Sequence, residues 1–348
     1  MSAEEFLNSL SEEQRAAAVH TSAPVMTLAG AGSGKTRMLI GRLLHLIRPK
    51  EDGGLGADPS SVMMVTFTNK AAREMRERVL PVLEELQERE PHRRIGEPWI
   101  GTFHGLSLRI LRIEASRAGL GPNFSIFDES DARSLVNDVT EEMGIDQFDA
   151  DEFFRDLETA KARVLPPDFL MRGRDLVAAG GPGAERWRPV LAHFRSDDFI
   201  DVYDRYQRAL EEQNAVDFSD LLNRTTKLFR EVPEVRDSWR STFRHFMVDE
   251  VQDINRAQVA WLVEVTGGGE ETQVADLSRG NDYAEAGDGM HEINTYRLRM
   301  FPRPTVAFVG DDDQSIYAFR GSEVAVMHGL SDRFAGLDVR FMGTSYRC

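Results

Sequence analysis

The sequence predicts an α/β protein in which a parallel β-sheet is wound with helices and carries a phosphate-binding loop. Short runs of strand-favouring residues alternate with helical patterns over residues 25–118, and this alternation resumes near residue 243. The stretch LAGAGSGKTRML, residues 28–39, leads from the first such run into a helical pattern and is close to G-x-x-x-x-G-K-[ST]. A later apolar run, FMVDE, ends in two carboxylates.

The composition is that of an ordinary globular protein with room for two domains. The 348 residues are 41% hydrophobic and 29% charged, and the apolar runs fall short of the roughly 20 residues that span a bilayer. The N-terminus is acidic, unlike a secretory signal, and the only cysteine is Cys348, so we predict a reducing, cytoplasmic setting without membrane contact. The formal net charge of −16 argues against a general nucleic-acid-binding face, so any DNA contact must use a local groove.

The first part of the chain contains three predicted strands, each followed by a helix. The strands are expected at residues 25–28, 61–67 and 99–103, and the helices at residues 36–47, 69–86 and from about 105. An earlier helix begins just after Ser11, because Ser11 and Gln14 fit the capping-box pattern S-x-x-Q. Thr68 is placed to cap the second of the three helices.

From about residue 119 to 200 the strand signals stop and acidic helical patterns dominate, which predicts an inserted helical subdomain. A further helical pattern over residues 203–229 is interrupted at Val216 and Asp217. Strands are then expected at residues 243–250, 304–311 and 337–342, and a helix at 255–265. We therefore assign residues 1–115 and 203–348 to the sheet domain, 116–202 to the inserted subdomain, and 267–303 to an unusually long Gly-rich insertion in the sheet domain.

The glycine-rich loop predicts a nucleoside triphosphate site. Glycines let the backbone turn so tightly that several N–H groups can point at phosphate, and Ala29 stands in place of the first glycine of the pattern. Lys35 is expected to reach the β- and γ-phosphates, Thr36 to hold Mg²⁺, and the helix that starts there to add its positive end. The predicted phosphate-contacting residues are Ala29, Gly30, Ala31, Gly32, Ser33, Gly34, Lys35 and Thr36.

The acidic strand end supplies the rest of this chemistry. Asp249 would bind Mg²⁺, and Glu250 would accept a proton from the attacking water. A third apolar strand leads into VGDDDQSIYAFRG, where Gln314 follows an acidic turn and could sense the γ-phosphate by a hydrogen bond. Asp249 and Glu250 could instead merely end a strand, but their combination with Thr36 is far more specific than the loop alone.

Two aromatic residues and an arginine follow the acidic turn. Tyr317, Phe319 and Arg320 suit stacking on nucleic-acid bases, a contact worth roughly 1–3 kcal/mol per base. An isolated aromatic pair of this kind would more often belong to the hydrophobic core. The sequence therefore predicts a base-stacking role here only in combination with the phosphate chemistry beside it.

The motifs, taken together, resemble those of UvrD/Rep-type superfamily 1 DNA helicases. The stretches EEQRAA, AGAGSGKTR, TFTNKAA, GTFHG, VDFSDLL, VDEVQD, VGDDDQSIYAFRG and SYRC cover nearly all of the chain, in that family's order. The resemblance implies a RecA-like fold and ATP hydrolysis with Mg²⁺. It also implies 3′-to-5′ movement along single-stranded DNA with unwinding at junctions between single and double strands.

The resemblance also implies roles for single residues. Gln14 would read adenine, although it also fits the capping box, and Arg37 would lie near the nucleotide. Tyr346 would stack on adenine and Arg347 would reach the γ-phosphate. Phe319 stands where many family members carry tryptophan, so its stacking area is smaller. The other implied DNA contacts are Thr66, Phe67, Thr68, Asn69, Lys70, Thr102, Phe103, His104, Asp217 and Phe218.

The family's motifs continue beyond SYRC into a second RecA-like domain that these residues do not include. We therefore expect the 348 residues to form the ATP-binding half of a helicase, with little activity on their own. The alternative is a non-catalytic nucleic-acid or protein-interaction module that keeps the fold. A GTPase is disfavoured, because Asn69 and Lys70 continue as Ala-Ala rather than as N-K-x-D.

Overall fold

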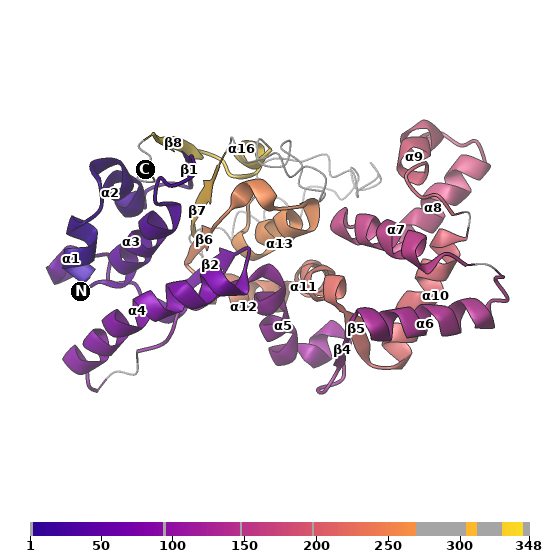
Figure 1. The fold of residues 1–348 in the computed structure, drawn as a ribbon, viewed down its shortest axis with the longest axis horizontal. Helices are drawn as coiled ribbons and strands as arrows, with labels where there is room; N and C mark the ends of the chain where they lie inside the picture. The colour runs from indigo at the N-terminus through magenta and orange to yellow at the C-terminus, as the bar shows by residue number, and fades with distance from the viewer. Residues whose placement is uncertain are drawn as a thin grey trace.

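A six-stranded parallel sheet forms the centre of the protein (Figure 1). The computed structural model describes residues 3–92, 95–146, 148–196, 198–268, 304–311 and 329–343. Within them the strand order is β3-β2-β6-β7-β1-β8, and every adjacent pair is parallel. The strands are β1 Val25–Ala29, β2 Val62–Thr66, β3 Trp99–Thr102, β6 His245–Val248, β7 Thr305–Gly310 and β8 Asp338–Met342. The predicted α/β fold with a parallel sheet is confirmed.

Helices cover both faces of this sheet, which is why its strands read as continuous apolar runs. Successive residues of β2 point to opposite faces: Met63 and Val65 belong to one hydrophobic cluster, Val62 and Met64 to the other. The helices on the Met64 side are α1 Ala3–Asn8, α2 Glu12–Val19, α3 Lys35–Ile47 and α4 Asn69–Arg89. Those on the Val65 side are α5 Phe103–Ile113, α11 Phe218–Glu231, α12 Pro233–Thr242 and α13 Arg256–Thr266.

A third hydrophobic cluster lies in the helical part of the molecule, away from the sheet (Figure 1). Its helices are α6 Glu129–Glu142, α7 Ala150–Ala162, α8 Pro167–Ala178, α9 Ala184–Leu191 and α10 Phe199–Glu212. Aromatic side chains fill its centre, with Phe153 in contact with Phe199 and Tyr206. The cluster continues to Ala215, so the predicted boundary at residue 202 falls inside α10, and the packing favours a boundary after that helix.

A second, two-stranded parallel sheet joins this helical part to the rest. Strand β4, Ser125–Phe127, pairs with β5, Ala215–Asp217. The helical patterns between residues 119 and 200 gave no sign of β4, because three residues are too few to show a strand period. The interruption expected at Val216 and Asp217 is β5 itself.

Short helical turns complete the described chain: η1 Lys50–Asp52, η2 Pro59–Ser61, η3 Ala115–Ala118, η4 Val251–Asp253 and α16 Leu330–Arg333. Among the residues that the structure describes, no helix is long and apolar enough to cross a membrane. Several predictions fall outside the described residues: the insertion from residue 269 onward, and Gln314, Tyr317, Phe319, Arg320, Tyr346 and Arg347.

Candidate nucleotide site and nucleic-acid surface

The strand order brings three functional segments to one edge of the sheet. Strand β7 lies between β6 and β1, with Val248 opposite Phe308 and Leu28 opposite Gly310. The glycine-rich loop after β1, the acidic pair after β6 and Asp311 after β7 therefore leave the sheet side by side. Ligands of open parallel sheets bind at this carboxyl edge.

The glycine-rich loop has the backbone that phosphate binding requires. Gly32 and Gly34 have φ angles of 81° and 84°, in the left-handed region that favours glycine. A side chain at Gly34 would also meet the Gln14 amide nitrogen, 2.4 Å from the added Cβ. Helix α3 starts at Lys35, and no side chain of the described residues caps its N-terminus. Its first N–H groups are therefore available to an anion.

Lys35 is held by carboxylates at the position where phosphate charge is expected. Its Nζ lies 3.1 Å from the Ala29 carbonyl oxygen and 3.1 Å from Asp311 Oδ2. The nearest Glu250 oxygen is 4.0 Å away. The lysine side chain is only 10% exposed and that of Asp311 only 1%, so this is a buried ion pair.

The two acidic residues after β6 have different surroundings. Asp249 is buried, and burial together with the neighbouring Glu250 charge raises the pKa of its carboxyl to about 7. Glu250 has a φ of 51°, a strained value for a residue with a side chain, and its carboxylate is partly exposed. Asp249 is thus protected from water, whereas Glu250 can reach a solvent molecule or ligand at the edge of the sheet.

Two residues of this site were missed by sequence reasoning. Gln252 donates from Nε2 to Glu250 Oε2 at 2.8 Å, and its Oε1 accepts from the Asp311 N–H at 3.0 Å. Gln252 therefore orients the proposed proton acceptor and fixes the turn that carries Asp311. Gln252 lies in the stretch VDEVQD and Asp311 in the stretch VGDDDQ. Their closeness in sequence to Glu250 and Gln314 is the signal that could have indicated them.

The donor set at this edge suits Mg²⁺ bound together with a triphosphate. Thr36 is the second residue of α3, and Asp249 directly follows strand β6. Within the described ranges, no group of three or more His, Cys, Asp or Glu side chains is arranged to hold a metal ion by itself. Mg²⁺ commonly takes one or two protein ligands and completes its shell with phosphate oxygens and water, so a hydroxyl and one carboxylate fit this ion.

Gln14 joins the first helices to the phosphate loop. The predicted capping box is present: Ser11 and Gln14 exchange side-chain to backbone hydrogen bonds at the start of α2. Gln14 Nε2 also donates to the Ser33 carbonyl at 2.8 Å. Arg37 turns toward α1, where it donates to Ser9 and lies over the Phe6 ring. The adenine-reading role of Gln14 and the nucleotide contact of Arg37 remain predictions.

A second group of predicted residues follows β2 and β3 at the same edge. Thr68 and Thr102 cap α4 and α5 through their hydroxyls, as expected for Thr68. Phe67 is 44% exposed, and the side chain of Lys70 is 85% exposed. Thr66 is buried and its hydroxyl donates to the Thr68 carbonyl, so its contribution is to shape this turn.

His104 and Phe218 form an aromatic pair beside these turns. Their rings stack with centroids 4.1 Å apart and an interplanar angle of 21°. Phe218 is 59% exposed, whereas burial lowers the pKa of His104 and keeps its ring neutral near pH 7. The pair therefore presents a flat, uncharged aromatic surface, which suits stacking on a nucleic-acid base.

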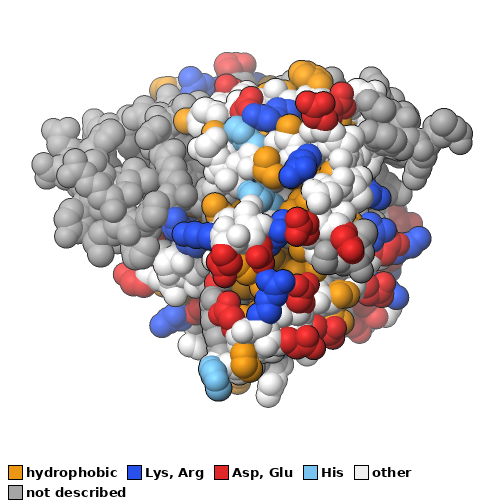
Figure 2. All heavy atoms as spheres, turned by 90° about the vertical axis from the view of Figure 1, so that its left-hand side faces the viewer, with side chains coloured by type: hydrophobic (Ala, Val, Ile, Leu, Met, Phe, Trp, Pro, Cys, Tyr) orange, Lys and Arg blue, Asp and Glu red, His pale blue; other side chains and the backbone are white. Residues whose placement is uncertain are grey.

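Two of the predicted DNA contacts need correction. Phe103 is 3% exposed and packs edge-on against Trp261, because the first residue of α5 points into the core while His104 points outward. Asp217 is 8% exposed and its carboxylate bonds to Lys161 and Tyr206. Neither side chain offers a surface to DNA. The face that carries the first helices shows acidic and basic side chains interspersed (Figure 2).

At the carboxyl edge of this parallel sheet lie a glycine-rich loop, a buried lysine and the acidic pair that follows β6. Together with the strand order, these features define a phosphate-loop nucleotide-binding protein of the RecA-like class. Residues 10–335 match the sequence model of the UvrD/REP helicase N-terminal domain. The chain belongs to this family, as its motifs predict.

The relatives that the chain matches are named ATP-dependent DNA helicases. The chain is 32% identical over 354 residues to the ATP-dependent DNA helicase UvrD1 of Mycobacterium leprae (strain TN), covering 98% of this chain and 38% of the relative. It is 33% identical over 325 residues to UvrD1 of Mycobacterium tuberculosis (strain ATCC 25618 / H37Rv), covering 92% and 35%. It is 30% identical over 345 residues to the ATP-dependent DNA helicase PcrA of Staphylococcus aureus (strain NCTC 8325 / PS 47), covering 98% and 38%. The chain thus spans less than two fifths of these relatives.

Proposed function

We propose that this chain is the ATP-binding part of a cytoplasmic, ATP-dependent helicase or translocase that moves 3′ to 5′ on single-stranded DNA and acts at junctions with duplex. The observation that carries the proposal is the convergence of Lys35, Glu250 and Asp311 on one carboxyl edge, beside the loop of Gly32 and Gly34. The printed names of the relatives, ATP-dependent DNA helicases, support it.

Each residue of the edge has a distinct role in this proposal. Lys35, now paired with Asp311, would turn to the β- and γ-phosphates of a bound triphosphate. Thr36 and Asp249 would hold Mg²⁺, whose charge would offset that of the phosphates. Glu250, oriented by Gln252, accepts the proton of the attacking water. The sequence motifs add Gln314 as γ-phosphate sensor, Arg347 as a positive charge on the γ-phosphate, and Gln14 and Tyr346 at adenine.

The proposed DNA track follows the turns after β2 and β3. Phe67, His104 and Phe218 provide stacking faces, while the exposed Lys70 provides charge for a phosphate. Thr68, Asn69 and Thr102 line the same helix N-termini and offer hydroxyl and amide groups. The motif after β7 adds Tyr317, Phe319 and Arg320 to this track.

Replacing Phe67 with alanine should weaken single-stranded DNA binding about 5- to 150-fold, the equivalent of roughly 1–3 kcal/mol for one lost stacking partner. The loss should be similar for different base sequences, because every base offers a stacking face. Fluorescence anisotropy with labelled oligonucleotides measures it. Leu80→Ala is the matched control, because Leu80 is a half-exposed apolar residue farther along α4. Equal affinities for Phe67→Ala and the unmodified chain would remove Phe67 from the track.

A polypeptide limited to these 348 residues should bind ATP but hydrolyse it very slowly. An arginine that stabilises the γ-phosphoryl group in the transition state is worth roughly 10³–10⁵ in rate, and the family's later arginine motif is not among these residues. Steady-state ATPase measurements with saturating single-stranded DNA, beside a strand-separation assay, test this. Brisk DNA-stimulated turnover would show that these residues contain a complete catalytic site.

A further inference from the structure

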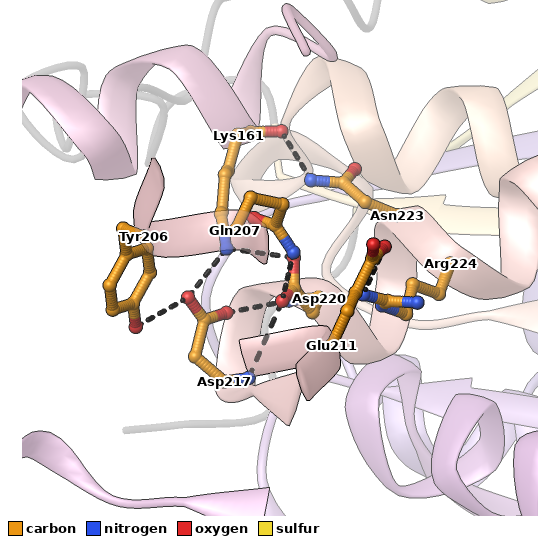
Figure 3. A network of polar contacts seen from close by, with 8 residues as sticks. All are labelled: Lys161, Tyr206, Gln207, Glu211, Asp217, Asp220, Asn223 and Arg224. Carbon is orange, nitrogen blue, oxygen red and sulfur yellow. Dashed lines mark hydrogen bonds and ion pairs between the residues drawn. The ribbon is translucent and has the colours of Figure 1, made fainter. Parts of the chain in front are cut away.

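A buried ion network joins the helical part of the molecule to the start of α11 (Figure 3). Lys161, the next-to-last residue of α7, is 2% exposed. Its ammonium donates to Asp217 Oδ2 at 2.5 Å and to Asp220 Oδ1 at 2.7 Å. The Tyr206 hydroxyl donates to the same Asp217 oxygen, and the Gln207 amide donates to Asp220 Oδ2. The network therefore ties α7 and α10 to the first turn of α11.

The two carboxylates are also what starts α11. Asp217 is the N-cap, and its side chain accepts from the Asp220 N–H at 2.9 Å, while Asp220 reaches back to the Asp217 N–H to complete a capping box. Phe218 directly follows Asp217 in this turn, and it stacks on His104 of α5. The lysine of one helix thus holds both ends of the turn from which the exposed aromatic ring projects.

The charge arrangement makes this turn sensitive to Lys161. Burial lowers the pKa of the lysine, but Asp217 and Asp220 more than offset that effect, so its pKa is raised and it stays charged. Without the ammonium, two buried carboxylates would face each other, with Arg224 near Asp220 as remaining positive charge. Breaking a buried ion network leaves uncompensated charge. The two carboxylates therefore cannot both stay buried and keep their hydrogen bonds to the N–H groups at the start of α11.

We propose that Lys161 is a positioning residue: acting through Asp217 and Asp220, it holds Phe218 against His104 and so couples the helical subdomain to the DNA-stacking surface. The DNA part of this inference rests on the proposed function, whereas the positioning of Phe218 does not. A movement of α7 relative to α11 would be transmitted to the aromatic pair by the same contacts.

The test uses Lys161→Met in the full 348-residue chain and reads two properties. The first is the pKa of His104 by NMR titration, which should rise toward its ordinary value, because Phe218 no longer covers the ring. The second is affinity for an oligo-dT strand by fluorescence anisotropy, which should fall about 5- to 50-fold, within the range for one stacking contact. Lys227→Met is the matched control, since Lys227 is exposed near the other end of α11 and should change neither property.

Three further variants keep the test decisive. Lys161→Met/Asp220→Asn removes one charge of each sign and is used if the single variant fails to fold. It should show the same rise in the His104 pKa and the same loss of oligo-dT affinity. Phe218→Ala alone should weaken DNA binding, and Lys161→Met/Phe218→Ala should weaken it no further. A folded Lys161 variant with unchanged His104 pKa and unchanged DNA affinity would overturn the inference, while the loss in Phe218→Ala would leave the proposed function standing. If Phe218→Ala binds DNA normally, the DNA role of the pair is wrong, and the His104 pKa alone decides the positioning.

Discussion

Replacing Lys35 with alanine is expected to raise the Kd for ATP by about 100-fold or more, which corresponds to about 2.7 kcal/mol. Hydrogen bonds to charged groups are worth roughly 1.5–3 kcal/mol each, and the lysine is expected to contact two phosphates. The side chain is already placed for this contact, with its ammonium 3.1 Å from both the Ala29 carbonyl and Asp311. Titration calorimetry in the presence of Mg²⁺ measures the change.

The control for this experiment is Lys227→Ala, which removes an exposed lysine of α11 and should leave ATP affinity unchanged. Circular dichroism must accompany the titration, because loss of Lys35 removes one ion-pair partner of the buried Asp311 carboxylate. A folded Lys35→Ala variant that binds ATP as tightly as the unmodified chain would show that the glycine-rich loop does not hold the triphosphate.

Replacing Asp249 with asparagine should stabilise the ligand-free protein above neutral pH while weakening its Mg²⁺-dependent ATP binding. The folded-state pKa of Asp249 is about 7, raised from 3.8 by burial and by Glu250. The folded protein therefore holds a proton that the unfolded chain releases, and stability falls as pH rises from about 4 to about 7. At one pKa unit per 1.36 kcal/mol, the full penalty above pH 7 is about 4 kcal/mol, and asparagine removes it.

Thermal unfolding should show an Asp249→Asn midpoint several degrees higher near pH 8 and equal to that of the unmodified chain below about pH 4. Glu77→Gln, a change at an exposed residue of α4, should shift stability by less than about 0.5 kcal/mol at either pH. If Asp249→Asn is the less stable protein near pH 8, the carboxylate is compensated in the fold and the raised pKa is wrong.

In the unmodified chain, Mg²⁺ and ATP together should release about one proton near pH 6.

Local features of the site could be predicted from neighbouring residues alone. The phosphate loop needs glycine at positions with positive φ, and Gly32 and Gly34 have that conformation. The capping box of Ser11 and Gln14 and the cap at Thr68 are likewise present, because each depends on residues only three apart. The roles of these residues toward ATP and DNA remain predictions that the experiments above test.

Features that depend on distant residues were not accessible in this way. Asp311 is 276 residues from Lys35, and Lys161 is 56 residues from Asp217, so no local pattern reports either ion pair. Phe103 and His104 are adjacent, yet one is in the core and the other faces the proposed DNA track. Successive side chains of an α-helix are rotated by about 100° around the helix axis. Which of them points into the core therefore depends on how α5 packs.

The sequence by itself determined the family and the alternation of strands and helices, because motif spacing and apolar period are properties of short segments. It also predicts which residues carry phosphate chemistry. Only the tertiary structure decided that β7 lies between β6 and β1, and thereby that Asp311 pairs with Lys35. It also decided that Asp217 serves a buried network instead of DNA. Strand order and buried ion pairs are settled by competition among many distant contacts, and that competition is resolved only when the chain packs.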